Sequence, residues 1–204
     1  MHHLILLFFL SLSNIVEAQQ VGDLFKAMPP ELLPGVSEGN KTMLLVDSGK
    51  TTVPYPLGEI VKEAYGNDYL RLQTSKIGTL QLKLLPVSED SVVVCLIKTV
   101  CGNVCDSHIS FYTSEWKKLG KEAFLPTISA EIFLNSSQKK SENDKYAVSL
   151  PDIYPISATF NETGTDLTLT FHYKERLAEE QIQQLEPLLK GDSVVLTWKN
   201  GSFR

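Results

Sequence analysis

Two of the three cysteines lie four positions apart in the segment IKTVCGNVCDSHISFYTSEW, where Gly-Asn-Val separates Cys101 from Cys105. Such a pair can form a disulfide, bind a metal or act as a redox centre. A redox centre of the thioredoxin type has two residues between its cysteines and lies at the start of a helix. Here three residues intervene, and the flanking segments are rich in the β-branched and aromatic residues that are typical of strands. We therefore expect the two cysteines at the tip of a β-hairpin.

This hairpin predicts which residues lie opposite each other. Folding the chain about Asn103, in a Gly-Asn pair typical of turns, places Cys101 opposite Cys105 and Cys95 opposite Phe111. Opposed residues of antiparallel strands have Cα atoms about 4.5–5.5 Å apart, which a disulfide can bridge. The sequence therefore predicts a Cys101–Cys105 disulfide, with free thiols or a metal site as the alternatives. Zinc is disfavoured, because the mature chain has only two histidines and no second cysteine pair.

The third cysteine is predicted to be a buried free thiol. In the same register, Cys95 shares a strand face with apolar residues, namely Val93, Ile97, Ile109 and Phe111. Free cysteines in such places usually behave as small apolar residues. A nucleophilic thiol would need a histidine nearby, and the register places His108 on the opposite face, across from Lys98.

The chain lacks several common motifs of catalytic and nucleotide-binding sites. It has no Walker loop, no dinucleotide fingerprint and no H-E-x-x-H. Its formal net charge is −5, and acidic neighbours balance the densest basic spot, Lys139-Lys140. Binding of nucleic acid needs a basic stripe. We therefore expect no catalytic residue, no metal, no cofactor and no nucleic-acid partner.

The hydrophobic pattern predicts the α+β class, with a mainly antiparallel sheet of meanders and hairpins, a few short helices and one C-terminal amphipathic helix. In TLQLKLL, three leucines alternate with Thr79, Gln81 and Lys83, which is typical of a sheet with one face in water. The strands expected in this meander are YLRLQTS, TLQLKLLP, SVVVCLIKTV and SHISFYT, and residues 91–113 form one hairpin. A second β group follows in YPISATFN, TDLTLTFHYK and SVVLTWKN.

Helices and breaks complete the expected organisation. Short helices are predicted in VGDLFKAMPP and, capped by Ser37, in VSEGNKTMLLV, although TMLLV also fits a strand. The C-terminal helix is ERLAEEQIQQLEPLLKG, which Gly191 ends. Two prolines and a glycine predict that TTVPYPLGEIVKEAYGNDY is a loop. We expect residues 19–204 to form a single domain, with two subdomains divided near 135–146 as the alternative.

The N-terminal segment MHHLILLFFLSLSNIVEAQQ is typical of a cleaved secretory signal. Its apolar run, Leu4 to Leu12, is shorter than the ~18 residues that span a membrane, so an N-terminal anchor is the weaker alternative. Small or aliphatic residues precede Gln19 at the expected cleavage point, and no cysteine there could carry a lipid. We predict a signal peptide over residues 1–18 and a periplasmic or secreted mature chain without a transmembrane segment. Such compartments favour disulfides.

Four segments resemble a known family: DLFKAMPPELLP, TMLLVD, YLRLQTSKIGTLQLKLLP and TVCGNVCDSHISFYTSEWKKL. They are similar to small secreted proteins of the Bacteroidales that are known only as a domain of unknown function. The resemblance implies a Gram-negative envelope protein and brings no catalytic residues. Our leading hypothesis is a non-enzymatic binding module that takes a protein or glycan partner through a sheet face or loops. The competing hypothesis is a hydrolase or thiol enzyme with an unrecognised site.

Overall fold

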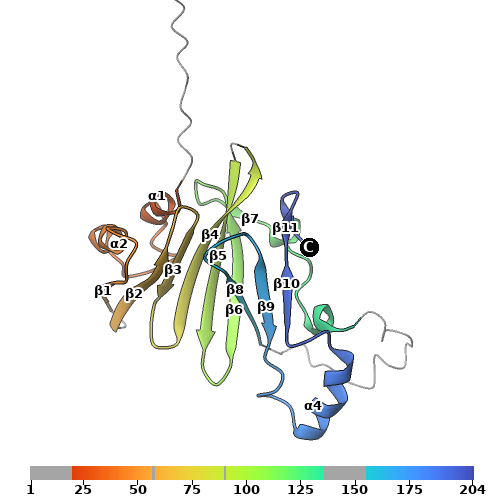
Figure 1. Ribbon diagram of the computed structural model, residues 1–204. Coiled ribbons are helices and arrows are strands. Elements are labelled where there is room, and N and C mark those ends of the chain that lie inside the picture. Colours follow the sequence, from red (N-terminus) through yellow and green to blue (C-terminus); the bar gives the residue numbers. More distant parts are fainter. Residues whose placement is uncertain (1–19, 57, 90, 136–154) are drawn as a thin grey trace, which may run out of the picture.

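The computed structural model describes residues 20–56, 58–89, 91–135 and 155–204. A seven-stranded antiparallel sheet, whose strands follow one another in chain order, dominates the fold. A three-stranded sheet packs against one of its faces and two short N-terminal helices pack against the other (Figure 1). The predicted α+β class and antiparallel meander are therefore confirmed.

The large sheet consists of β1 (Thr51–Tyr55), β2 (Gly58–Tyr65), β3 (Tyr69–Gln73), β4 (Gly78–Ser88), β5 (Ser91–Cys101), β6 (Cys105–Tyr112) and β7 (Lys118–Leu119). The first two strands correct a prediction, because their segment was expected to be a loop. Pro54 is tolerated because β1 is an edge strand, which pairs on one side only. Val53 and Ile60 lie opposite each other and are both buried, so burial outweighs the proline signal.

The small sheet has the order β10-β9-β8, and a separate two-stranded hairpin lies at the C-terminus. These strands are β8 (Ile156–Phe160), β9 (Leu167–Phe171), β10 (Ser193–Leu196), β11 (Trp198–Lys199) and β12 (Ser202–Phe203). The helices are α1 (Val21–Lys26), α2 (Glu38–Leu44), α4 (Glu179–Leu185) and the 3-10 helices η1 (Lys121–Ala123), η2 (Ala130–Phe133) and η4 (Glu186–Leu188). Ser37 caps α2 as predicted. The C-terminal helix exists but is shorter than expected, because the chain tightens into η4 at Pro187.

Alternate residues of the large sheet enter two separate cores. In β5, Val94 and Leu96 face the helices, whereas Cys95 and Ile97 face the small sheet. On the helix side, α1 contributes residues such as Phe25 to the core. Because both faces of β5 are covered, its sequence is a continuous apolar run rather than an alternating one.

Two of the three polar positions in TLQLKLL, Gln81 and Lys83, are also buried, contrary to the water-exposed face predicted from this segment. Gln81 is 2% exposed and Lys83 is 0% exposed. The Oε1 atom of Gln81 accepts hydrogen bonds from the Tyr69 hydroxyl and from the backbone N–H of Phe160, each at 3.0 Å. The Lys83 ammonium forms an ion pair with Asp68 at 2.9 Å. The prediction of one wet face is therefore wrong for β4, because these polar ends find partners inside the protein.

The β5–β6 hairpin has the register predicted from the sequence. Cys101 lies opposite Cys105, Cys95 lies opposite Phe111, and His108 is on the other face, across from Lys98. The structure joins Cys101 to Cys105 in a disulfide and leaves Cys95 as a completely buried thiol. The disulfide thus closes the tip of the hairpin.

Replacing Gln81 with leucine should destabilise the protein by about 1–3 kcal/mol, because it leaves the buried Phe160 N–H and Tyr69 hydroxyl without an acceptor. Urea unfolding followed by tryptophan fluorescence would measure the loss. The matched control is Gln183→Leu on the exposed side of α4, which should change stability by less than about 0.5 kcal/mol. Equal losses in both variants would show that Gln81 does not hold β8 in place.

The protein is purified from its native source and alkylated under denaturing, non-reducing conditions. One cysteine should be labelled, and peptide mapping should place the label at Cys95. The double replacement Cys101→Ser/Cys105→Ser should cost at most ~2 kcal/mol, because a loop of about five residues constrains the unfolded chain only weakly. Mass spectrometry and urea unfolding would test the two statements. Labelling of all three thiols would contradict the disulfide.

Candidate functional site

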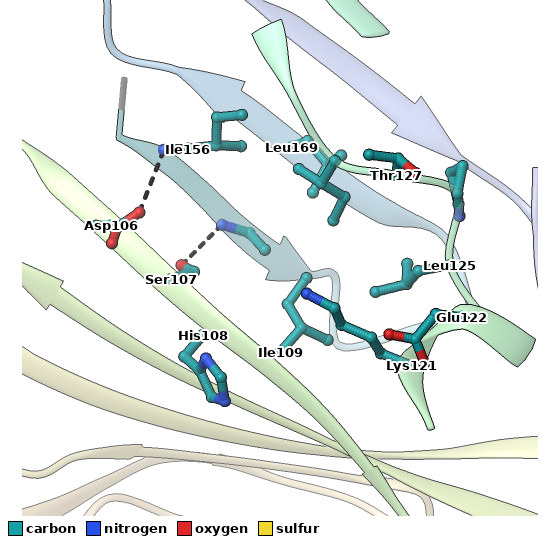
Figure 2. Close-up of a pocket in the computed structure, with 13 residues that line it drawn as sticks. Asp106, Ser107, His108, Ile109, Lys121, Glu122, Leu125, Thr127, Ile156 and Leu169 are labelled. Atoms are coloured by element: carbon teal, nitrogen blue, oxygen red, sulfur yellow. Dashed lines mark hydrogen bonds between the residues drawn. The ribbon is translucent and has the colours of Figure 1, made fainter. Parts of the chain in front are cut away.

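A cavity of about 610 Å³ lies between β6 and the small sheet (Figure 2). The segment that follows β7, from η1 to residue 128, closes its far side. A volume of this size is typical of sites for small ligands, which range from about 300 to 1,000 Å³. The lining residues are Asp106, Ser107, His108, Ile109, Lys121, Glu122, Leu125, Pro126, Thr127, Ile128, Ile156, Ala158 and Leu169.

The walls of the cavity combine polar residues with an aliphatic part. Ile109 comes from β6, Leu169 comes from β9, and Leu125 and Ile128 come from the segment after η1. All four belong to the core between the two sheets or pack against it. The cavity is therefore an opening into the edge of this core, with side chains that the fold already holds in place.

Two side-chain hydrogen bonds fix β8 beside β6. The N–H of Ile156 donates to the Asp106 carboxylate at 3.3 Å, and the N–H of Ala158 donates to the Ser107 hydroxyl at 2.9 Å (Figure 2). Thr99 bonds the same hydroxyl at 2.7 Å. Side chains of the large sheet thus take the place of a neighbouring strand along this edge of β8. The Ser107 hydroxyl already has two hydrogen-bond partners, the Ala158 N–H and the Thr99 hydroxyl.

The charged residues of the lining gather at the end of the cavity near η1. Figure 2 shows the Lys121 amine extending into the cavity toward Ile109, with Glu122 beside it. Both residues are exposed, and within the described part of the chain neither forms an ion pair. His108 touches the rim from the other side, because its ring lies on the opposite face of β6 from Ile109 (Figure 2). The cavity therefore combines an aliphatic part of its wall with an amine and a carboxylate at one end.

The cysteines singled out in the sequence do not line this cavity. Cys105 precedes the lining residue Asp106, so the disulfide closes the hairpin tip beside the cavity. Complete burial raises the pKa of the Cys95 thiol, which disfavours the thiolate that a nucleophile requires. Among the described residues, no group of three histidine, cysteine or acidic side chains could hold a metal ion.

A serine, a histidine and a glutamate that the sequence did not single out lie close together on the small sheet. The Ser157 hydroxyl and the Nε2 atom of His172 are 2.8 Å apart, and Glu175 lies 3.8 Å from Nδ1 of the same ring. This order of groups can activate a serine, but the carboxylate is beyond hydrogen-bond distance. Ser157 alternates along β8 with the buried Ala158, so the set lies on the outer face of the small sheet and not in the cavity. Only the pairing of β8 with β9 brings Ser157 and His172 together.

Comparison with known proteins gives a structural relative and a family. No curated protein matches the chain. A solved domain of an uncharacterized protein from Porphyromonas gingivalis W83 is similar, with a TM-score of 0.75 and 27% identity over 92% of this chain and 98% of that one. No helix in the described residues is long and apolar enough to cross a membrane. The model of the family described as "Protein of unknown function (DUF3256)" matches residues 13–203, so the chain belongs to this family.

Proposed function

We propose that the protein is an exported, non-enzymatic binding module whose ligand site is the cavity between β6 and the small sheet. The observation that carries the proposal is the cavity itself, whose walls combine aliphatic and polar side chains, with the Lys121 amine directed into it and the Glu122 carboxylate beside that amine. Binding sites typically combine apolar walls with a few polar groups that orient the ligand. The partner belongs to the protein or glycan classes expected from the sequence, and the net charge of −5 argues against nucleic acid.

Export is proposed on the composition of the N-terminal segment, which lies outside the described residues. The disulfide at the hairpin tip supports it, because such bonds persist in oxidising compartments. The similar domain comes from Porphyromonas gingivalis, a member of the Bacteroidales, which is the group that the sequence resembles. We also propose that residues 19–204 form a single domain. The core between the sheets joins Phe111 to Phe160 and Leu169, which lie on either side of the suggested boundary near 135–146.

The competing hypothesis was a hydrolase or a thiol enzyme. Burial of Cys95 disfavours the thiol. The Ser157–His172 contact favours a hydrolase, but it lies on the face of β8 that does not line the cavity. A serine nucleophile needs a substrate site beside it. Because Ser157 does not line the cavity, the cavity supports ligand binding rather than hydrolysis by this serine.

A bulky residue at the rim should block the cavity without disturbing the core. Thr127 is exposed and lines the rim, so Thr127→Trp should leave stability nearly unchanged. The probe is 8-anilinonaphthalene-1-sulfonate, an apolar anion that matches the aliphatic walls and the Lys121 amine. Titration followed by amide NMR should shift Ile109 and Leu169, and Thr127→Trp should weaken binding by about tenfold or more.

The matched control for the blocked cavity is Thr52→Trp, which adds the same ring to the exposed side of β1 at the other edge of the large sheet. This variant should bind the probe like the unmodified protein. Near-ultraviolet circular dichroism would verify that all three proteins keep their tertiary structure, because the probe also binds partly folded states. Equal binding by both tryptophan variants would overturn the cavity as the ligand site.

The export proposal predicts that protein purified from its native envelope begins at Gln19, give or take about two residues. Cleavage at this point follows from the small and aliphatic residues at the end of the signal segment. Intact-mass analysis and N-terminal sequencing would measure the terminus. Recovery of the chain with Met1 in place would contradict cleavage.

A further inference from the structure

The strand β6 has a partner along the whole of one edge but along only part of the other. It pairs with β5 from Cys105 to Tyr112, whereas β7 pairs with Phe111 and Tyr112 alone. After β7 the chain turns away at Gly120 into η1. The lower part of this second edge, which includes four lining residues of the cavity, therefore has no neighbouring strand within the described part of the chain.

The backbone groups of Ser107 and Ile109 point toward this open edge. On the β7 side, the N–H of Thr113 donates to the carbonyl of Lys117 at 2.9 Å. Backbone groups alternate in direction along an antiparallel strand, so every second residue before Thr113 faces the same side. This set includes Ile109 and Ser107. Among the described residues, no group bonds their outward N–H and carbonyl groups.

The small sheet leaves this edge available. Its β8 strand reaches β6 through the side chains of Asp106 and Ser107 rather than through the backbone. Figure 2 shows β8 and β6 moving apart toward Ile109, and the cavity occupies the space between them. An unpaired strand edge beside apolar side-chain sites is the arrangement that binds extended peptides by strand addition.

The cavity also indicates which part of a peptide would enter it. A strand added beside Ser107 and Ile109 runs into the turn at Gly120, so it has to end there. The amine directed into this end is that of Lys121, with the exposed Glu122 beside it, while Asp106 at the other end already accepts a hydrogen bond from β8. A chain end that meets the amine is best matched by a carboxylate.

We propose that the cavity binds the C-terminal tail of a partner protein as an extended strand parallel to β6. The backbone of Ser107 and Ile109 bonds the tail, alternate apolar side chains lie against Leu125 and Leu169 in the aliphatic part of the wall, and the free carboxylate lies against Lys121. The inference rests on the proposed function, since it takes the same cavity as the ligand site, and adds the class of ligand.

The test uses the tetrapeptide acetyl-Thr-Val-Thr-Val with a free C-terminus, whose valines occupy alternate positions. Titration into the folded full-length mature protein should shift the amide signals of Ser107 and Ile109. The C-terminal amide of the same peptide should bind about threefold to fivefold more weakly, as expected for loss of an exposed ion pair. A version methylated on the backbone nitrogen of its inner valine should also lose affinity, because it lacks a donor for the strand edge.

Substitution of the lysine separates a specific contact from a general charge effect. Lys121→Gln should weaken the acid peptide about threefold to fivefold and leave the amide peptide unchanged. The matched control, Lys199→Gln, removes an exposed amine from β11 and should affect neither peptide. Equal sensitivity of both peptides to Lys121→Gln would overturn the carboxylate contact.

The outcomes also distinguish this inference from the proposed function. If 8-anilinonaphthalene-1-sulfonate binds in the cavity and no peptide does, the peptide inference is wrong and the ligand site stands. If the methylated and unmodified peptides bind equally, strand addition is wrong. If neither the anilinonaphthalene probe nor the peptides shift the lining residues, both proposals fail.

Discussion

Burial of the large sheet on both faces is the constraint on which the rest of the structure depends. A strand covered on both sides has no position for an unpartnered polar side chain, so β5 is apolar almost throughout and β4 carries polar residues only where they find partners. Covering the two faces needs two different layers. The N-terminal helices supply one of them, and the small sheet, built from the last third of the chain, supplies the other.

The small sheet meets the large one through side chains that bond one edge of β8. The edge N–H groups of β8 are bonded by side chains of the large sheet, Gln81 among them, instead of by another strand. Side chains hold two strands further apart than a backbone ladder does, for which the spacing is about 4.8 Å. Within the described residues, the lower edge of β6 consequently has no backbone partner, and the cavity occupies the space between the two strands.

The disulfide and the cavity belong to the same hairpin. Cys105 joins the tip of β6 to β5, and the next two residues, Asp106 and Ser107, hold β8. A link at the tip limits slippage of the two strands, and slippage by one residue would turn Ser107 away from the small sheet. The disulfide therefore stabilises the register on which the walls of the candidate site depend. Cys95 has no comparable role beyond filling space in the core.

Local patterns in the sequence were sufficient for the meander, the hairpin register and the pairing of Cys101 with Cys105, because turn residues and a period of two decide which neighbouring residues face each other. They could not decide which faces are covered. Gln81 looked water-exposed and is buried, because Phe160, 79 positions later in the chain, donates to it. The strand β1, the Ser157–His172 contact and the cavity likewise depend on tertiary packing. Periodicity assigns residues to opposite faces of a strand, but the burial of each face depends on segments that meet only in the folded chain.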